Sequence, residues 1–151
     1  MAEQTTSSIV IDAAPAAVMG VIADFEAYPS WAQGVKKAEP VEQGGDDGRP
    51  AEVYFELDAS PIKDAYTLAY DWDGDDGVRW DLAEPGSVIT ALSGGYLLAD
   101  ADEGTKVTYD LAVDVRIPMP RMLKRRAEKT IIETALKGLR DRAEAGRGDG
   151  T

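Results

Sequence analysis

The 151-residue chain contains neither histidine nor cysteine. Without histidine it cannot form a Ser-His-Asp or Cys-His catalytic arrangement, and it has no imidazole to offer a metal ion. Without cysteine it can form neither a disulfide nor a thiolate metal site. Any acid–base chemistry must therefore come from Asp, Glu, Tyr, Lys or ordered water, and we expect no metal ion and no obligatory cofactor.

Sequence motifs for nucleotides, membranes and secretion are missing as well. The chain has no G-x-x-x-x-G-K-[ST] phosphate loop and no G-x-G-x-x-G following a strand, which argues against a nucleotide-dependent enzyme. It has no run of about 18 apolar residues, as a membrane-spanning helix requires. The first residues, MAEQTTSS, lack both the basic start and the apolar core of a secretory signal. We therefore expect a cytoplasmic location and no stable membrane insertion.

Positive charge is outnumbered: 16 Lys and Arg face 28 Asp and Glu, which gives a formal net charge of −12. Binding to phosphates depends on cationic side chains that displace counterions. The overall charge thus argues against nucleic acid and anionic lipid surfaces as general partners. Its simplest role is to keep the protein soluble.

Residues 9–31 predict a strand, a broken helix and an aromatic corner. Residues 9–11 form a short apolar run, and Pro15 suits the first turn of a helix, where the N–H that it lacks would have no partner. Apolar residues then recur at helical spacing as far as Phe25, and Pro29 interrupts the helix before Trp31.

Most of the chain after Trp31 predicts strands separated by turns. Clusters of Gly, Asp, Ser and Pro, for example at residues 44–48 and 60–61, are typical of turns. Between the clusters apolar and polar residues alternate, most clearly over residues 107–115, so one face of each strand is predicted to point inward. Consecutive strands with short connections predict an antiparallel meander. The predicted strands span residues 35–43, 51–58, 63–72, 78–83, 87–99 and 105–116.

Residues 119–145 predict a long helix that covers the apolar face of the sheet. About 27 helical residues span roughly 40 Å, enough to cross a sheet. We expect residues 1–145 to form a single domain and residues 146–151 to be a disordered tail. The predicted apolar stripe of the helix consists of Met122, Leu123, Ala127, Ile131, Ala135, Leu136 and Leu139.

The pattern I-x-A-x-P-x-x-V-x-x-V-I-A-D-F-E-x-Y-P-x-W, which runs from Ile11 to Trp31, resembles the N-terminus of the START-like, or Bet v 1-like (SRPBCC), superfamily. This superfamily includes polyketide cyclase/dehydrase and coenzyme Q-binding proteins. Residues 94–98 and 104–109 are similar to its penultimate hairpin. The resemblance implies an α+β helix-grip fold: a seven-stranded antiparallel sheet wrapped around a long C-terminal helix, with two short helices after the first strand. It also implies a ligand site between the sheet and that helix.

Aromatic residues gather on the face predicted to point inward. Tyr and Trp combine a large apolar body with one polar group, which suits a cavity for an apolar ligand, although aromatic side chains also simply fill cores. Trp31 either packs over one end of the cavity or is a structural plug. Ser93 and the glycines beside it leave room for a ligand. The candidate ligand-binding residues are Trp31, Phe55, Tyr66, Tyr70, Trp80, Ser93, Tyr96, Tyr109, Met122, Leu123, Ala127 and Ile131.

A basic cluster interrupts the acidic chain at the start of the long helix. It has two interpretations: a solvated helix face, or a cavity mouth that attracts an acidic head group, a carrier protein or a membrane edge. In the second case Met119, Met122 and Leu123 would form an adaptable apolar lip. The cluster consists of Arg116, Arg121, Lys124, Arg125, Arg126 and Lys129, with Glu128 as the only acid. Its candidate contacts with an anionic group are Arg116, Arg121, Lys124 and Arg125.

These observations favour a protein that binds or transports a hydrophobic small molecule or lipid. The alternative is an aromatase/cyclase-like enzyme acting on a polyketide-type substrate, because a cyclase needs mainly shape and a few hydrogen-bond donors. No carboxylate falls on the inner face of a clearly alternating strand, so we assign no catalytic residue and lean against an enzyme. A third reading is a regulatory interaction protein without a ligand. A homodimer is left open.

Overall fold

The computed structural model describes residues 5–32, 34–43, 49–59, 62–116 and 118–149. The turns predicted at residues 44–48 and 60–61 lie outside these ranges. The elements in chain order are β1 (Thr5–Ile11), α1 (Pro15–Ala23), the short 3-10 helix η1 (Phe25–Ala27), α2 (Tyr28–Trp31), β2 (Val35–Gln43), β3 (Pro50–Ala59), β4 (Ile62–Asp73), β5 (Gly77–Glu84), β6 (Ile89–Ala101), β7 (Gly104–Val115) and α3 (Arg121–Asp149).

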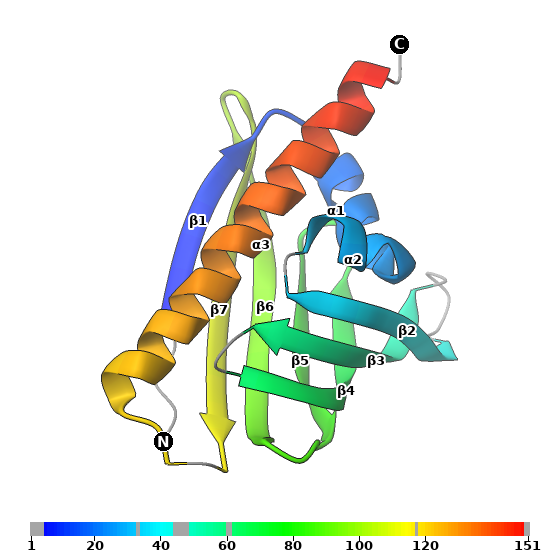
Figure 1. Cartoon of the computed structure of the whole chain (residues 1–151). Coiled ribbons are helices and arrows are strands. Elements are labelled where there is room, and N and C mark those ends of the chain that lie inside the picture. Colours follow the sequence, from blue (N-terminus) through cyan, green and yellow to red (C-terminus); the bar gives the residue numbers. More distant parts are fainter. Residues whose placement is uncertain (1–4, 33, 44–48, 60–61, 117, 150–151) are drawn as a thin grey trace.

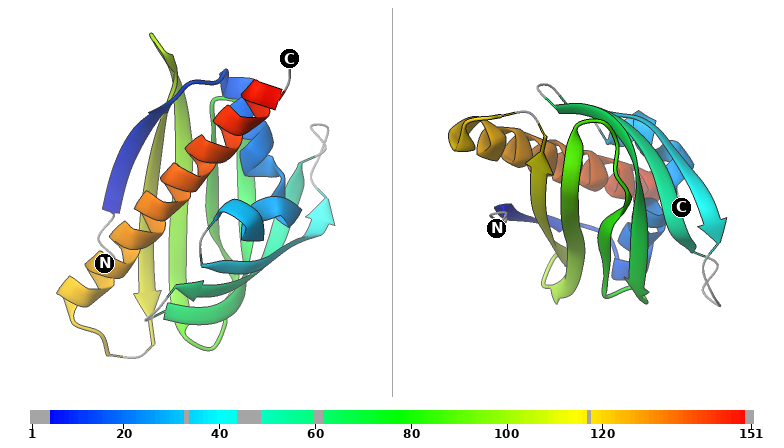
Figure 2. Two further views of the ribbon diagram at one scale, coloured as in Figure 1. Left: turned by 45° about the horizontal axis from the view of Figure 1, so that its top comes forward. Right: turned by 90° about the horizontal axis from the view of Figure 1, so that it is seen from below.

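One seven-stranded antiparallel sheet has the strand order β1-β7-β6-β5-β4-β3-β2. Strands β2 to β7 each pair with their neighbours in the chain, as the predicted meander requires. The first strand instead pairs with the last, with Thr5 opposite Leu111. The sheet curls so that β2 and β3 run crosswise to β6 and β7, and α3 lies across its concave side (Figures 1 and 2). This confirms the helix-grip fold expected from the sequence.

The break between α1 and α2 turns aromatic side chains toward the core. Pro15 occupies the first turn of α1, as predicted. Phe25 is buried between the two helices, and its ring centroid lies 4.9 Å from that of Tyr28. The Tyr28 hydroxyl donates a hydrogen bond to the backbone oxygen of Ile22 in α1. The two short helices therefore form a fixed cap at one end of the sheet.

The long helix α3 approaches α2 very closely at Gly138. A Cβ at this position would lie 2.1 Å from the backbone oxygen of Trp31, so only glycine allows the observed contact. On the side of the helix toward the sheet, the side chains of Ala127, Ile132 and Leu139 are buried. The helix is thus fixed against α2 at one end of the concave face.

The two ends of α3 differ from the prediction. Met122 and Leu123, predicted to belong to the buried stripe, are 77% and 40% exposed. The reason is that the start of α3 projects past the β1–β7 side of the sheet (Figures 1 and 2), whereas Ala127 and Glu128 one turn later are buried. At the other end the helix continues past Ala145 to Asp149, so residues 146–149 of the predicted tail are helical. Residues 150 and 151 lie outside the described ranges.

Two carboxylates hold distant parts of the fold together. Glu128, the acid within the basic cluster, is buried on α3 and accepts hydrogen bonds from Thr5 Oγ1 and the Val113 amide. Asp64 on β4 accepts hydrogen bonds from the backbone amides that lead into β6, at residues 87–89. Desolvation raises the pKa of Asp64, but these amides outweigh it and the pKa lies below its usual value.

Candidate ligand-binding cavity

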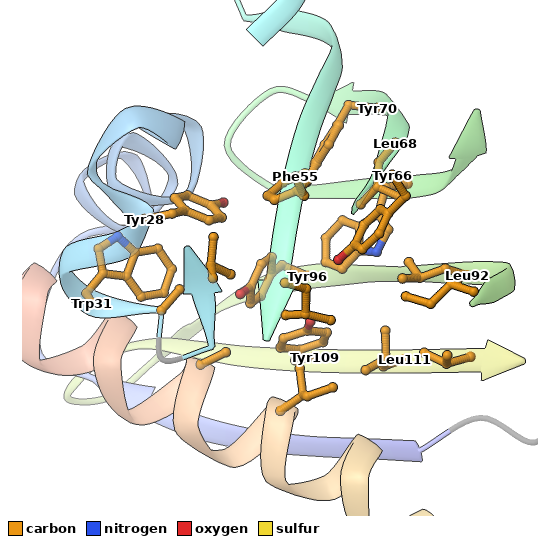
Figure 3. Close-up of a pocket in the computed structure, with 18 residues that line it drawn as sticks. Tyr28, Trp31, Phe55, Tyr66, Leu68, Tyr70, Leu92, Tyr96, Tyr109 and Leu111 are labelled. Carbon is orange, nitrogen blue, oxygen red and sulfur yellow. The ribbon is translucent and has the colours of Figure 1, made fainter. Parts of the chain in front are cut away.

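A cavity lies between the concave face of the sheet and α3, with α2 at one end (Figure 3). The region open to the centre of a water-sized sphere measures about 80 Å³. One water molecule needs roughly 10–15 Å³ by this measure, so the cavity is real but narrow. Its aliphatic lining consists of Ala32, Val35, Leu57, Leu68, Ile89, Leu92, Leu111, Val113, Ile131 and Ala135. Its aromatic lining consists of Tyr28, Trp31, Phe55, Tyr66, Tyr70, Trp80, Tyr96 and Tyr109.

The aromatic side chains pack against one another as well as around the cavity. The ring centroids of Tyr96 and Tyr109, on paired strands, lie 4.6 Å apart. Trp80 meets Tyr109 edge to face at 5.6 Å, and its centroid lies 5.7 Å from that of Tyr70. Such contacts contribute about 0.5–1.5 kcal/mol each beyond area burial. The sheet side of the cavity is therefore a connected aromatic wall.

Four tyrosine hydroxyls in this wall have no hydrogen-bond acceptor among the described residues. Tyr66, Tyr70, Tyr96 and Tyr109 line the cavity, and none of them donates a hydrogen bond to a described group, in contrast to Tyr28. Burial raises the pKa of each of the four above its ordinary value near 10, with a smaller contribution from neighbouring side chains. The hydroxyls are thus protonated at any physiological pH, and they can donate hydrogen bonds but cannot act as bases.

Trp31 carries a further buried donor at the α2 end of the cavity. Its Nε1 is inaccessible to solvent and has no hydrogen-bond partner in the described part of the chain. The indole ring lies 4.8 Å from the ring of Tyr28 and lines the cavity beside α3 (Figure 3). The structure thus places Trp31 at one end of the cavity.

The structure brings together eight of the twelve candidate ligand-binding residues and leaves four outside the lining. Ser93 is one of the four, because β6 turns Leu92, Gly94 and Tyr96 inward and Ser93 alternates with them. The inward position beside it belongs to Gly94, where a Cβ would lie 3.1 Å from the Trp80 ring. The eight residues that line the cavity are Trp31, Phe55, Tyr66, Tyr70, Trp80, Tyr96, Tyr109 and Ile131.

The other three residues outside the lining belong to the start of α3. Met122 and Leu123 face solvent. Ala127 is buried, but the helix lines the cavity only from Ile131 onward, through Ile131 and Ala135. The lining on α3 thus begins about one turn after Ala127 and about two and a half turns after Met122.

Sequence reasoning also missed part of the lining, although the signal was present. Leu57, Leu68, Leu111 and Val113 follow the same alternation that placed the tyrosines inward, so the strand pattern already contained them. Tyr28 lies within the N-terminal pattern that resembles the START-like superfamily. Ile89 and Leu92 lie three positions apart and share the inner face because of the register shift between Ile89 and Ala91, which alternation alone does not predict.

The candidate contacts for an anionic group lie outside the cavity. Arg116, Arg121 and Arg125 are exposed, and Lys124 Nζ lies 3.1 Å from Asp114 Oδ1. None of these four residues lines the cavity. The described lining consequently contains no charged side chain.

Neither a metal centre nor a membrane span is found in the described ranges. No three or more Asp or Glu side chains gather there as they would around a metal ion. No helix there is both long enough and apolar enough to cross a membrane.

A curled antiparallel sheet that grips a long C-terminal helix around an apolar cavity defines the helix-grip class of START-like, or Bet v 1-like, proteins. Residues 2–144 match the family described as polyketide cyclase/dehydrase and lipid transport, and the chain belongs to this family. A comparison with curated protein sequences gives no match.

Solved structures with the same fold include proteins of several kinds. A START superfamily protein from Mycobacterium smegmatis is 20% identical with a TM-score of 0.84, and the match covers 94% of this chain and 97% of that one. The Zhui aromatase/cyclase from Streptomyces sp. R1128 is 16% identical with a TM-score of 0.78, over 97% and 96% of the two chains. A protein of Thermus thermophilus is 23% identical with a TM-score of 0.83, over 95% and 99%. At these identities the likeness establishes the fold.

Proposed function

We propose that the protein binds a neutral, compact hydrophobic molecule in the cavity between the sheet and α3, as a carrier and not as a catalyst. The observation that supports this most is the composition of the cavity wall. Its described lining has no charged side chain, and its polar side-chain atoms are tyrosine hydroxyls and indole nitrogens. Ligand pockets of this kind are mostly apolar with a few placed polar groups.

The wall favours a neutral ligand. A carboxylate or phosphate group of a ligand would lose its hydration on entering the cavity and would find no cationic side chain in the described lining to compensate for the loss. An apolar body gains about 25 cal/mol for each Å² removed from water. The hydroxyls of Tyr66, Tyr70, Tyr96 and Tyr109 offer hydrogen bonds to one or two carbonyl or hydroxyl oxygens of such a ligand. The narrow space favours a ligand of one or two fused rings.

A cyclase is the second candidate, since the Zhui protein is an aromatase/cyclase of the same fold. Tyrosine hydroxyls could orient a chain of ketones by hydrogen bonds. A cyclisation also needs a group that removes a proton, and the raised pKa of Tyr66, Tyr70, Tyr96 and Tyr109 makes the lining tyrosines unsuitable as bases. The lining therefore supports binding better than it supports catalysis.

The test uses a neutral fluorophore with a single naphthalene ring system, 6-propionyl-2-dimethylaminonaphthalene, and a matched pair of competitors with the same ring system. We expect 2-acetylnaphthalene to displace the fluorophore and 2-naphthoic acid to compete at least about tenfold more weakly at neutral pH, because only the acid carries a charge. Equal or stronger competition by the acid would contradict a neutral ligand.

A matched pair of variants on α3 locates the binding site. Ala135 lines the cavity, whereas Ala145 is exposed on the same helix. We expect Ala135→Leu to fill the cavity and weaken binding of the fluorophore at least about tenfold, and Ala145→Leu to leave it unchanged. Circular dichroism shows whether each variant is folded. Unchanged binding by a folded Ala135→Leu protein would place the ligand elsewhere.

A further inference from the structure

We propose that the first turns of α3 dock the protein reversibly onto an anionic lipid bilayer. The docking face consists of Met122, Leu123, Arg126 and Lys129. This inference concerns the outer surface and goes beyond the binding of a ligand in the cavity. Its test uses the protein without a ligand, so its failure would leave the proposed function untouched.

The four residues lie together on the solvent side of the helix. Met122, Arg126 and Lys129 follow the i, i+4, i+7 spacing of one helix face, and Leu123 lies beside them. All four are exposed, with Met122 at 77% and Leu123 at 40%. The face therefore combines two large apolar side chains with two cations, and Glu133 follows it one turn later.

Positive charge is concentrated at the start of α3, in an otherwise acidic protein. Residues 116–129 carry six Lys and Arg and one acid, a net +5, while the whole chain carries −12, so the rest carries −17. The one acid in this segment, Glu128, is buried beneath the helix and is 1% exposed. Of this segment the solvent meets cations such as Arg126 and Lys129 and not Glu128, while Lys124 is paired with Asp114 of β7.

The placement of α3 resolves the conflict between the acidic protein and an anionic membrane. The start of the helix projects past the β1–β7 side of the sheet (Figures 1 and 2). Ala127 and Glu128 in the second turn are already buried, and Glu128 accepts the amide of Val113 on β7, so about one turn, or roughly 5 Å, extends past the sheet. The Debye length is about 8 Å at physiological ionic strength, so salt screens the repulsion from the more distant parts of the acidic body. The same charge asymmetry orients the molecule with the docking face toward a negative surface.

The combination of side chains favours lipid over an acidic protein. Amphipathic helices that lie at a bilayer surface place apolar side chains among the acyl chains and Lys or Arg at the phosphates. Met122 is 77% and Leu123 40% exposed, and the apolar interior of a bilayer would remove their apolar surface from water. Two such side chains provide a weak, reversible contact and not a permanent anchor.

Sedimentation with vesicles tests the proposal. We expect the ligand-free protein to sediment with vesicles of phosphatidylglycerol and phosphatidylcholine at low salt, but not with phosphatidylcholine alone. Arg126→Gln/Lys129→Gln should weaken this binding on the order of twentyfold, because each cation near an anionic surface contributes roughly fivefold. Met122→Ser/Leu123→Ser should also weaken it on the order of tenfold.

Matched controls change the same types of residue elsewhere on the surface. Lys63→Gln/Lys106→Gln removes two exposed cations, and Val10→Ser/Leu97→Ser removes two exposed aliphatic side chains. Both control proteins should bind anionic vesicles as the parent does. Absence of binding to anionic vesicles, equal binding to neutral ones, or an effect of the controls as large as that of the test variants would overturn the proposal. Binding to soluble poly-glutamate but not to vesicles would overturn the choice of lipid.

Discussion

Glu128 on α3 accepts the backbone amide of Val113 on β7, with Oε2 and N 2.9 Å apart. Its other oxygen accepts the hydroxyl of Thr5 on β1 at 2.8 Å. One buried side chain thus joins the helix to the first and last strands of the chain. Hydrogen bonds to a charged group contribute about 1.5–3 kcal/mol, and a buried amide left without an acceptor is costly.

Glu128→Ala should lower the free energy of unfolding by about 3 kcal/mol, because it leaves the Val113 amide unsatisfied and opens a cavity. Glu128→Gln should cost only about 1 kcal/mol, since its amide oxygen can still accept from Val113. Urea unfolding measures both. Glu133→Ala, at an exposed position one turn later, is the control and should change stability by less than about 0.5 kcal/mol. Equal stability of Glu128→Ala and Glu133→Ala would show that the hydrogen bonds of Glu128 to β1 and β7 do not stabilise the fold.

Asp64→Asn should lower stability by about 1–2 kcal/mol at neutral pH, because the amides of residues 87–89 lose a charged acceptor. The pKa of Asp64 is lowered in the folded protein, so its contribution is present above the unfolded value of 3.8 and disappears as the pH falls through the folded value. The difference between parent and variant, followed by urea unfolding across pH, should therefore vanish in acid. Asp71→Asn, on the exposed side of the same strand, should show no such loss. A difference that persists unchanged below about pH 3 would argue against the charge of Asp64 as its cause.

In an alkaline titration, Tyr54 should behave differently from the other five tyrosines. Burial raises the pKa of the five tyrosines that line the cavity, whereas Tyr54 lies at the surface, where its hydrogen bond to Glu56 raises its pKa. A raised folded pKa stabilises the protein below the unfolded value near 10 and loses that contribution as the pH rises further. Absorbance at 295 nm should thus show at most one tyrosine ionising before unfolding. Smooth ionisation of several tyrosines in the folded protein would contradict the closed aromatic wall.

Gly138→Ala should lower the free energy of unfolding by about 1–2 kcal/mol, although alanine favours helices by about 1 kcal/mol. The new Cβ would overlap the Trp31 backbone oxygen and push α3 away from α2. Gly20→Ala in α1 is the control, because a Cβ there meets nothing within 4 Å, and it should raise the melting temperature. If the Gly138→Ala protein were as stable as the Gly20→Ala protein, α3 could shift away from α2 at little cost in free energy, which would contradict a fixed contact.

The strands were predictable because each has one buried face, and residues such as Val107, Tyr109 and Leu111 repeat with the period of two that a strand requires. The aromatic part of the cavity followed from the same pattern. What alternation could not provide was the exact phase of a strand within a glycine-rich segment. Ser93 was placed inward because Gly94 and Gly95 carry no side chain that marks a face.

The start of α3 was less predictable for a different reason. A helix reveals its apolar stripe in the sequence, but not where the sheet beneath it ends. Met122 continues the period of the stripe yet is 77% exposed, whereas Ala127, just over one turn later, is buried. Glu128 shows the opposite case, since its charge suggested a surface position and its buried partners come from strands distant in the chain.

The pairing of β1 with β7 also sets an order for folding during synthesis. Thr5 leaves the ribosome about 100 residues before its partner Leu111, which corresponds to about 5–20 s at ordinary rates of translation. In that interval the hairpins from β2 to β6 can form by local pairing, while β1 has no partner strand. Closing the contact between β1 and β7 then requires most of the chain to form one loop, which is the slow kind of step in folding. The nascent N-terminal strand is consequently the segment of this protein that most depends on protection from aggregation until the last strand and α3 have emerged.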